Sequence, residues 1–131
     1  MSVPTTVSRD VTRVAADGGL MLAGFSVAFA VVGLSPGFSW VPEALLLGAA
    51  VFVPAVVLAW TGWRAARRAN GIATAAFVTA TAGLIGGGVA GTMYVLYGKS
   101  PLNVPIGLAA GAIAGSFVGG LTAALALRLG R

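Results

Sequence analysis

The sequence predicts an all-α, polytopic membrane protein whose four transmembrane helices form two hairpins, with both termini in the cytoplasm. Composition carries the first part of this prediction: the 131 residues are 58% hydrophobic and only 8% charged, whereas soluble domains are about 45–50% apolar and about 25% charged. The apolar residues form four long blocks, and the basic residues gather at one side of them. Lipid rather than water is therefore the expected solvent of most of the chain.

The apolar blocks define the expected spans, which are residues 18–34, 42–63, 71–97 and 104–127. All but the first exceed the roughly 20 residues that a helix needs to cross the hydrocarbon core of a bilayer. We therefore expect a cytoplasmic tail over residues 1–16 and one four-helix transmembrane domain over residues 17–131.

Local signals mark where the helices should begin. Asp17 precedes the first block and Asn70 the third, so we expect each side chain to cap a helix N-terminus. Pro42 with Glu43, and Pro105, stand where a missing N–H group or a negative charge suits a first helical turn. The second, third and fourth helices are thus expected to start close to these residues.

The first block also fits a cleavable signal peptide, because it is the shortest and Ala28-Phe29-Ala30 loosely matches the small-x-small cleavage pattern. The region before this block is long, however, and carries Asp10 and Asp17 beside its arginines. We therefore prefer a retained first helix.

Basic residues predict the orientation. Arg9 and Arg13 precede the first block, whereas Lys99 alone lies on the opposite side of the predicted membrane. Short cytoplasmic loops carry an excess of Lys and Arg, so both termini should be cytoplasmic. The other residues that indicate this topology are Arg64, Arg67, Arg68, Arg128 and Arg131.

Aromatic residues favour the same orientation. Trp60 and Trp63 end the second block on the predicted inner side, whereas Trp40, Tyr94 and Tyr97 lie on the outer side. Trp and Tyr are enriched at membrane interfaces, so we interpret both groups as interfacial belts. The alternative is that the three outer rings enclose a cationic ligand.

Glycine recurs at every fourth position in the third and fourth blocks. Because four residues slightly exceed one helical turn, each series forms a smooth face on which another helix can lie close, as in a glycine zipper. The helix-packing residues predicted in this way are Gly83, Gly87, Gly91, Gly107, Gly111, Gly115 and Gly119.

The partner of each glycine series is left open by the sequence. The two series can pack on each other within one subunit, or on a second copy or another membrane subunit. Small residues on more than one face of the fourth block predict a central fourth helix, and Gly86-Gly87-Gly88 in the third predicts a hinge or a point of close approach. Pro54 is expected to kink the second helix.

Several function classes are excluded or disfavoured by what the chain lacks. Without cysteine or histidine there are no disulfides or thiolates, and the commonest metal ligand and proton shuttle are missing. No ionisable residue lies near the centre of any block, and the helix dipole explains Glu43. We predict no catalytic, cofactor or metal site, and no nucleic-acid partner, because the few basic residues form no continuous surface.

Small four-span multidrug exporters and small fluoride channels have a similar length, but the chain lacks the membrane glutamate of the former and the polar Asn and Phe arrangement of the latter. The leading hypothesis is therefore a non-enzymatic membrane protein, a structural or accessory subunit or a homo-oligomer, which assembles through its third and fourth helices. The alternative is a small oligomeric channel, permease or holin-like pore former. Its path would be lined by the hydroxyls of Ser26, Thr74, Thr79, Thr81, Thr92, Ser116 and Thr122.

Overall fold

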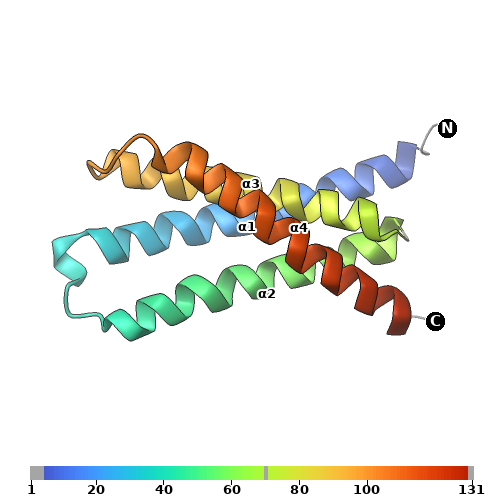
Figure 1. Cartoon of the computed structure of the whole chain (residues 1–131), viewed down its shortest axis with the longest axis horizontal. Coiled ribbons are helices and arrows are strands. Elements are labelled where there is room, and N and C mark those ends of the chain that lie inside the picture. The colour runs from blue at the N-terminus through green and yellow to red at the C-terminus, as the bar shows by residue number, and fades with distance from the viewer. Residues whose placement is uncertain (1–4, 70, 130–131) are drawn as a thin grey trace.

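The computed structural model describes residues 5–69 and 71–129, and these residues form four long helices (Figure 1). The elements are α1 (Thr5–Leu34), the short 3₁₀ helix η1 (Pro36–Phe38), α2 (Glu43–Ala69), α3 (Ile72–Leu96) and α4 (Asn103–Leu129). Each α-helix contains a stretch that is long and apolar enough to cross a bilayer. The prediction of an all-helical chain with four possible spans is confirmed.

The first helix begins earlier than the sequence suggested, at Thr5 rather than near residue 18. Val14 is only 1% exposed and packs on Ala65 and Ala66 of α2, so burial of this side chain extends α1 ahead of the apolar block. Asp17 consequently lies inside α1. The prediction that Asp17 caps the first helix is wrong, because its carboxylate pairs with an arginine of α2 instead.

The other helices start within one residue of the expected positions. Glu43 opens α2, and the backbone N–H groups of Leu45 and Leu46 donate to the carbonyl of Pro42. Gly71 occupies the N-cap position of α3 with an extended backbone and no side-chain cap, whereas Asn70 lies outside the described residues. Pro105 lies in the first turn of α4.

The end of α3 is a Schellman motif around Gly98, whose φ of 88° is the left-handed conformation that favours glycine. The N–H of Lys99 donates to the carbonyl of Tyr94 at 2.9 Å, and that of Gly98 donates to the carbonyl of Val95 at 3.0 Å. These bonds satisfy carbonyls at the helix end, and the chain turns sharply towards α4.

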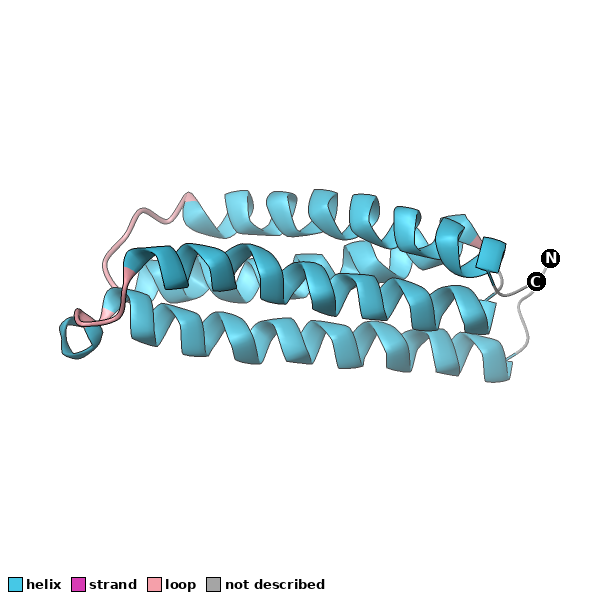
Figure 2. Cartoon of the chain, turned by 90° about the horizontal axis from the view of Figure 1, so that it is seen from below, coloured by secondary structure: helices cyan, strands magenta, loops and turns pink. Residues whose placement is uncertain are grey.

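All four helices run along one long axis, and both termini lie at the same end of the bundle (Figure 2). We call this the terminal end, and we call the opposite end, with the α1–α2 and α3–α4 connections, the loop end. Neighbouring helices follow the order α1, α3, α4, α2 around the bundle, and α2 also contacts α3 across it. Within the part of the chain that the structure describes, α1 and α4 do not touch.

Both α2 and α3 contact each of the other three helices, but the contacts of α3 are the more extensive, so α3 is the central helix. The prediction of a central α4 is wrong. Among the described residues, α3 has seven that are buried and α4 has four. The second small-residue face of α4 is largely uncovered, because Ser116 and Ala124 are exposed and Gly120 meets only Ala76 of α3.

The core is made of small side chains, and the large ones point outward. Buried alanines and a few larger residues form two clusters between the helices, whereas bulky side chains such as Phe52, Phe77 and Phe117 are about 70% exposed. A surface of this kind suits hydrocarbon, not water. Together with the four long apolar helices, it describes a multi-pass membrane protein.

Candidate functional site

The most extensive helix contact in the molecule joins α3 to α4. Gly83 lies against Gly111, and Gly87 lies against Gly107. A Cβ atom on any of these four glycines would collide with the carbonyl oxygen of its counterpart. Backbone therefore packs directly on backbone in the middle of both helices, where weak Cα–H···O contacts add to dispersion.

The remaining glycines of the two series extend this contact in both directions. Gly91 faces the backbone of Asn103 and Val104, and Gly115 faces the carbonyl of Thr79. Gly119 faces the side chain of Thr79. Each of the seven glycines singled out by its spacing thus lies where α3 and α4 meet, and a side chain at any of them would push the helices apart.

Each glycine of the triplet Gly86-Gly87-Gly88 allows a different neighbouring group to approach α3 closely. Gly86 approaches Leu22 of α1, Gly87 approaches the backbone of α4, and Gly88 approaches Leu108 of α4. The helix is unbroken through the triplet. Close approach to two helices at once therefore accounts for three adjacent glycines.

One close contact was missed in the sequence, between Gly62 of α2 and Gly119 of α4. A Cβ atom on Gly62 would lie 2.9 Å from the Cα of Gly119. The sequence signal that could have predicted this contact is the pair of small residues Gly62 and Ala66, four positions apart. Both are buried in the structure. This contact fastens α2 to α4 towards the terminal end.

An ion pair links α1 to α2 near the same end. The Arg64 guanidinium donates to an Asp17 carboxylate oxygen at 3.3 Å, with the two side chains 22% and 41% exposed. The same guanidinium lies 4.5 Å above the ring of Trp60, and Arg67 lies 5.6 Å from that of Trp63. Of the other predicted topology residues, Arg68 and Arg128 are exposed, and Arg131 lies outside the described residues.

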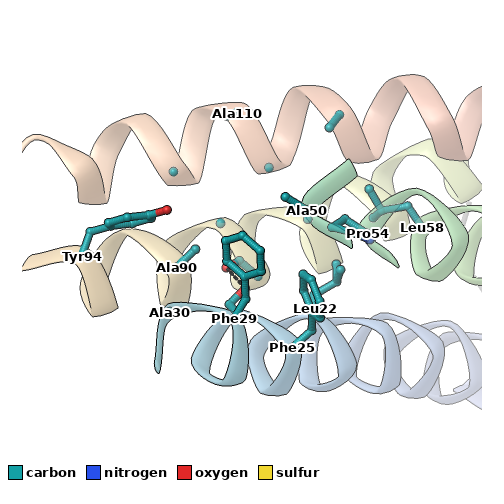
Figure 3. Close-up of a pocket in the computed structure, with 17 residues that line it drawn as sticks. Leu22, Phe25, Phe29, Ala30, Ala50, Pro54, Leu58, Ala90, Tyr94 and Ala110 are labelled. Atoms are coloured by element: carbon teal, nitrogen blue, oxygen red, sulfur yellow. Dashed lines mark hydrogen bonds between the residues drawn. The ribbon is translucent and has the colours of Figure 1, made fainter. Parts of the chain in front are cut away.

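Towards the loop end the four helices enclose a cavity of about 350 Å³, shown in Figure 3. Phe25 and Phe29, whose ring centroids are 5.6 Å apart, line it from α1, and Tyr94 lines it from α3. Ala50 and Pro54 line it from α2, which stays helical across the proline. Four of the glycines at the α3–α4 contact, Gly83, Gly87, Gly107 and Gly111, form part of its wall.

The cavity opens sideways towards the surroundings of the bundle. Ala110 and Ala114 line it from α4 and are nevertheless exposed. At the loop end, α4 begins beside α3 and away from α2, and it crosses towards α2 only nearer the terminal end (Figure 1). The pocket is therefore a lateral opening between α2 and α4 within the apolar part of the helices.

The three outer aromatic residues do not share one pocket. Trp40 is 76% exposed, and the Tyr97 hydroxyl lies 3.0 Å from that of Ser35, within hydrogen-bonding distance. Tyr94 lines the cavity, whereas neither Trp40 nor Tyr97 does. None of the hollows between the described helices is lined by all three rings, so the cage alternative gains no support.

The hydroxyl groups considered as pore lining are largely used within the helices. Thr79, Thr81, Thr92, Ser116 and Thr122 each donate to a carbonyl three or four residues earlier in their own helix. Ser26 differs, because its Oγ donates to the carbonyl of Gly86 in α3 at 3.2 Å. Of these groups, Ser26 links α1 to α3 and the others bond within their own helices, so they form no continuous polar path through the described helices.

No protein-family model, curated protein or solved structure matches this chain. Fold and site geometry therefore carry the functional argument. That geometry offers helix surfaces and several apolar hollows as the places where the protein can meet another molecule.

Proposed function

We propose that this chain is a non-enzymatic protein of the cell membrane that serves as a structural or accessory subunit. It associates through its fourth helix with a second copy or with another membrane subunit. The glycine series of α3 and α4 holds the subunit together, and a different face of α4 provides the contact between subunits. The excess of basic residues around the terminal end supports a cytoplasmic position for both termini.

The observation that carries this proposal is a second series of small residues on α4, also at four-residue spacing. It consists of Ala112, Ser116, Gly120 and Ala124. Ser116 and Ala124 are exposed, and a Cβ atom on Gly120 would meet only Ala76, at an ordinary contact distance of 3.9 Å. Small residues are the usual means of close helix association in lipid, and this series is left over once α3 is in place.

The test is the double variant Ser116→Leu with Ala124→Leu, studied in mild detergent. We expect its molar mass by light scattering to fall to that of one chain, or a co-purifying subunit to be lost, with helix content unchanged. The matched control is Ala28→Leu with Ala44→Leu, two exposed alanines on α1 and α2. A wild-type protein that is monomeric and purifies alone, or an equal loss in variant and control, would contradict the proposal.

The pore-forming alternative has less support from the geometry. Its candidate hydroxyls are hydrogen-bonded within the helices, and the cavity is lined mainly by carbon. Solute or ion flux through liposomes containing the purified protein, above the leak of empty liposomes, would nevertheless favour a pore over the accessory role.

A further inference from the structure

A second hollow continues the cavity towards the loop end. It has a volume of about 190 Å³, lies between α1 and α2, and shares Phe29, Ala30 and Tyr94 with the larger cavity. Leu46 and Leu47 form its α2 side, and Glu43 lies at its edge in the first turn of α2. The two hollows are therefore neighbours, and we call them together the apolar passage, which runs from beside a carboxylate to the space between the helices.

The larger of these two hollows has the size and lining of a binding site for a hydrocarbon chain. Its volume of about 350 Å³ is within the about 300–1,000 Å³ of ligand pockets and more than twice that of an engineered apolar cavity of about 150 Å³ that binds benzene and stays dry. The hydroxyl of Ser26 donates to the Gly86 carbonyl, and Tyr94 is the other hydroxyl-bearing residue of the lining. Most of the cavity wall is therefore apolar, which suits a hydrocarbon chain.

The carboxylate at the edge supplies charge complementarity. Glu43 is exposed, and its side chain has no hydrogen-bond or ion-pair partner among the side chains that the structure describes, those of residues 11–68 and 71–129. Its position at the first turn of α2 places it beside the apolar passage, where a head group would sit if the attached chain entered the cavity. A negative charge at that point attracts a cationic head group and repels an anionic one.

We propose that the passage binds a single-chain cationic amphiphile, with its hydrocarbon chain in the cavity beside Phe29 and Tyr94 and its ammonium group at Glu43. The ligand enters sideways from the bilayer through the opening between α2 and α4. This site is separate from the small-residue face of α4 through which we propose that subunits associate.

The experiment uses the full chain in liposomes, with a diazirine-bearing alkyltrimethylammonium as photolabel and dodecyltrimethylammonium as competitor. We expect mass spectrometry to place the label on residues around Phe29, Leu47 and Tyr94, and the competitor to remove it. Uncharged dodecyl maltoside should compete more weakly. Labelling spread evenly over the exposed faces of all helices, or cross-links from a second copy filling the passage, would overturn the proposal.

Two variants separate the contribution of the ligand's head group to binding from that of its hydrocarbon chain. Glu43→Gln removes the charge and keeps the shape of the side chain. The concentration of dodecyltrimethylammonium that halves photolabelling should rise about three-fold, as expected for the loss of an exposed ion pair. The concentration of dodecyl maltoside that halves photolabelling should stay the same. Ala90→Leu narrows the cavity and should reduce labelling by both probes, whereas Ala28→Leu, outside it, should not. Unchanged competition in both Glu43→Gln and Ala90→Leu would overturn the proposal, and molar masses of the same samples test subunit association independently.

Discussion

The pair α3 and α4 and the pair α1 and α2 are held together in opposite ways. Backbone meets backbone along much of the α3–α4 contact, whereas α1 and α2 are joined by an ion pair near the terminal end and separated by hollows towards the loop end. Glycine content alone does not explain the difference, since Gly24, Gly33 and Gly48 meet nothing within 4 Å. Close packing requires glycines at matching heights on two facing helices.

The largest effect should come from Gly111→Leu with Gly115→Leu. Both positions face the backbone of α3, so the new side chains force the helices apart at an expected cost of about 2–6 kcal/mol for the pair. The measurement is the free energy of unfolding in mixed micelles, followed by circular dichroism.

The control for this prediction is Gly24→Leu with Gly33→Leu, at two glycines with open space around them. Removing glycine from a helix favours that helix by up to about 1 kcal/mol per site, so stability should stay the same or rise. An equal loss from both double variants would show that glycine acts through helix propensity or lipid contact and not through the α3–α4 interface.

A smaller loss is expected when the ion pair of Asp17 and Arg64 is broken. Because both side chains are partly exposed, Asp17→Asn should cost about 1 kcal/mol, between the values for exposed and buried pairs. Arg64→Met also removes the contact with Trp60, so a double-mutant cycle is needed to isolate the pair. A coupling energy near zero would assign the α1–α2 contact to side-chain packing alone.

Filling the cavity should stabilise the packing of α2 against the other helices and so raise the free energy of unfolding. Ala50→Leu adds apolar volume from α2 to the wall of the cavity, and we expect a gain of about 1 kcal/mol in the free energy of unfolding. Ala44→Leu, at an exposed position of the same helix, should leave the value unchanged. A loss of stability in Ala50→Leu alone would mean that α2 lies closer to the other helices in the membrane.

The smallest effect is expected at Ser26, whose hydroxyl donates to the Gly86 carbonyl across the α1–α3 contact. Ser26→Ala should cost about 0.6 kcal/mol, the average for hydrogen bonds between helices in a membrane. Thr122→Ala removes a bond within α4 and should have a smaller effect in the same unfolding assay. Equal losses of unfolding free energy in Ser26→Ala and Thr122→Ala would mean that the Ser26 hydroxyl does not stabilise the α1–α3 contact.

The sequence predicted those features that depend on neighbouring residues in one helix. The starts of α2, α3 and α4 follow from Pro42, Gly71 and Pro105 and from the long apolar blocks beside them. The glycines that line the α3–α4 contact were recognised by their regular spacing, because a helix turns spacing directly into a face. These glycines pack within the subunit, and association between subunits stays a prediction.

Features that depend on the order of helices around the bundle could not be predicted in this way. The pairing of Asp17 with Arg64 joins residues 47 positions apart, and nothing local distinguishes it from a helix cap followed by a topology signal. The cavity exists because α2 leaves α4 towards the loop end, which no single segment encodes. The central place of α3 is likewise a property of three interfaces together.

The arrangement around α3 also sets an order for biogenesis. Chains fold from the N-terminus during synthesis, and α1 contacts α3 more extensively than it contacts α2. The first helix is therefore made before its main partner, α3, and the second before its main partner, α4. Until α3 and α4 follow, the contacts open to the first two helices are those with each other, which include the ion pair of Asp17 with Arg64.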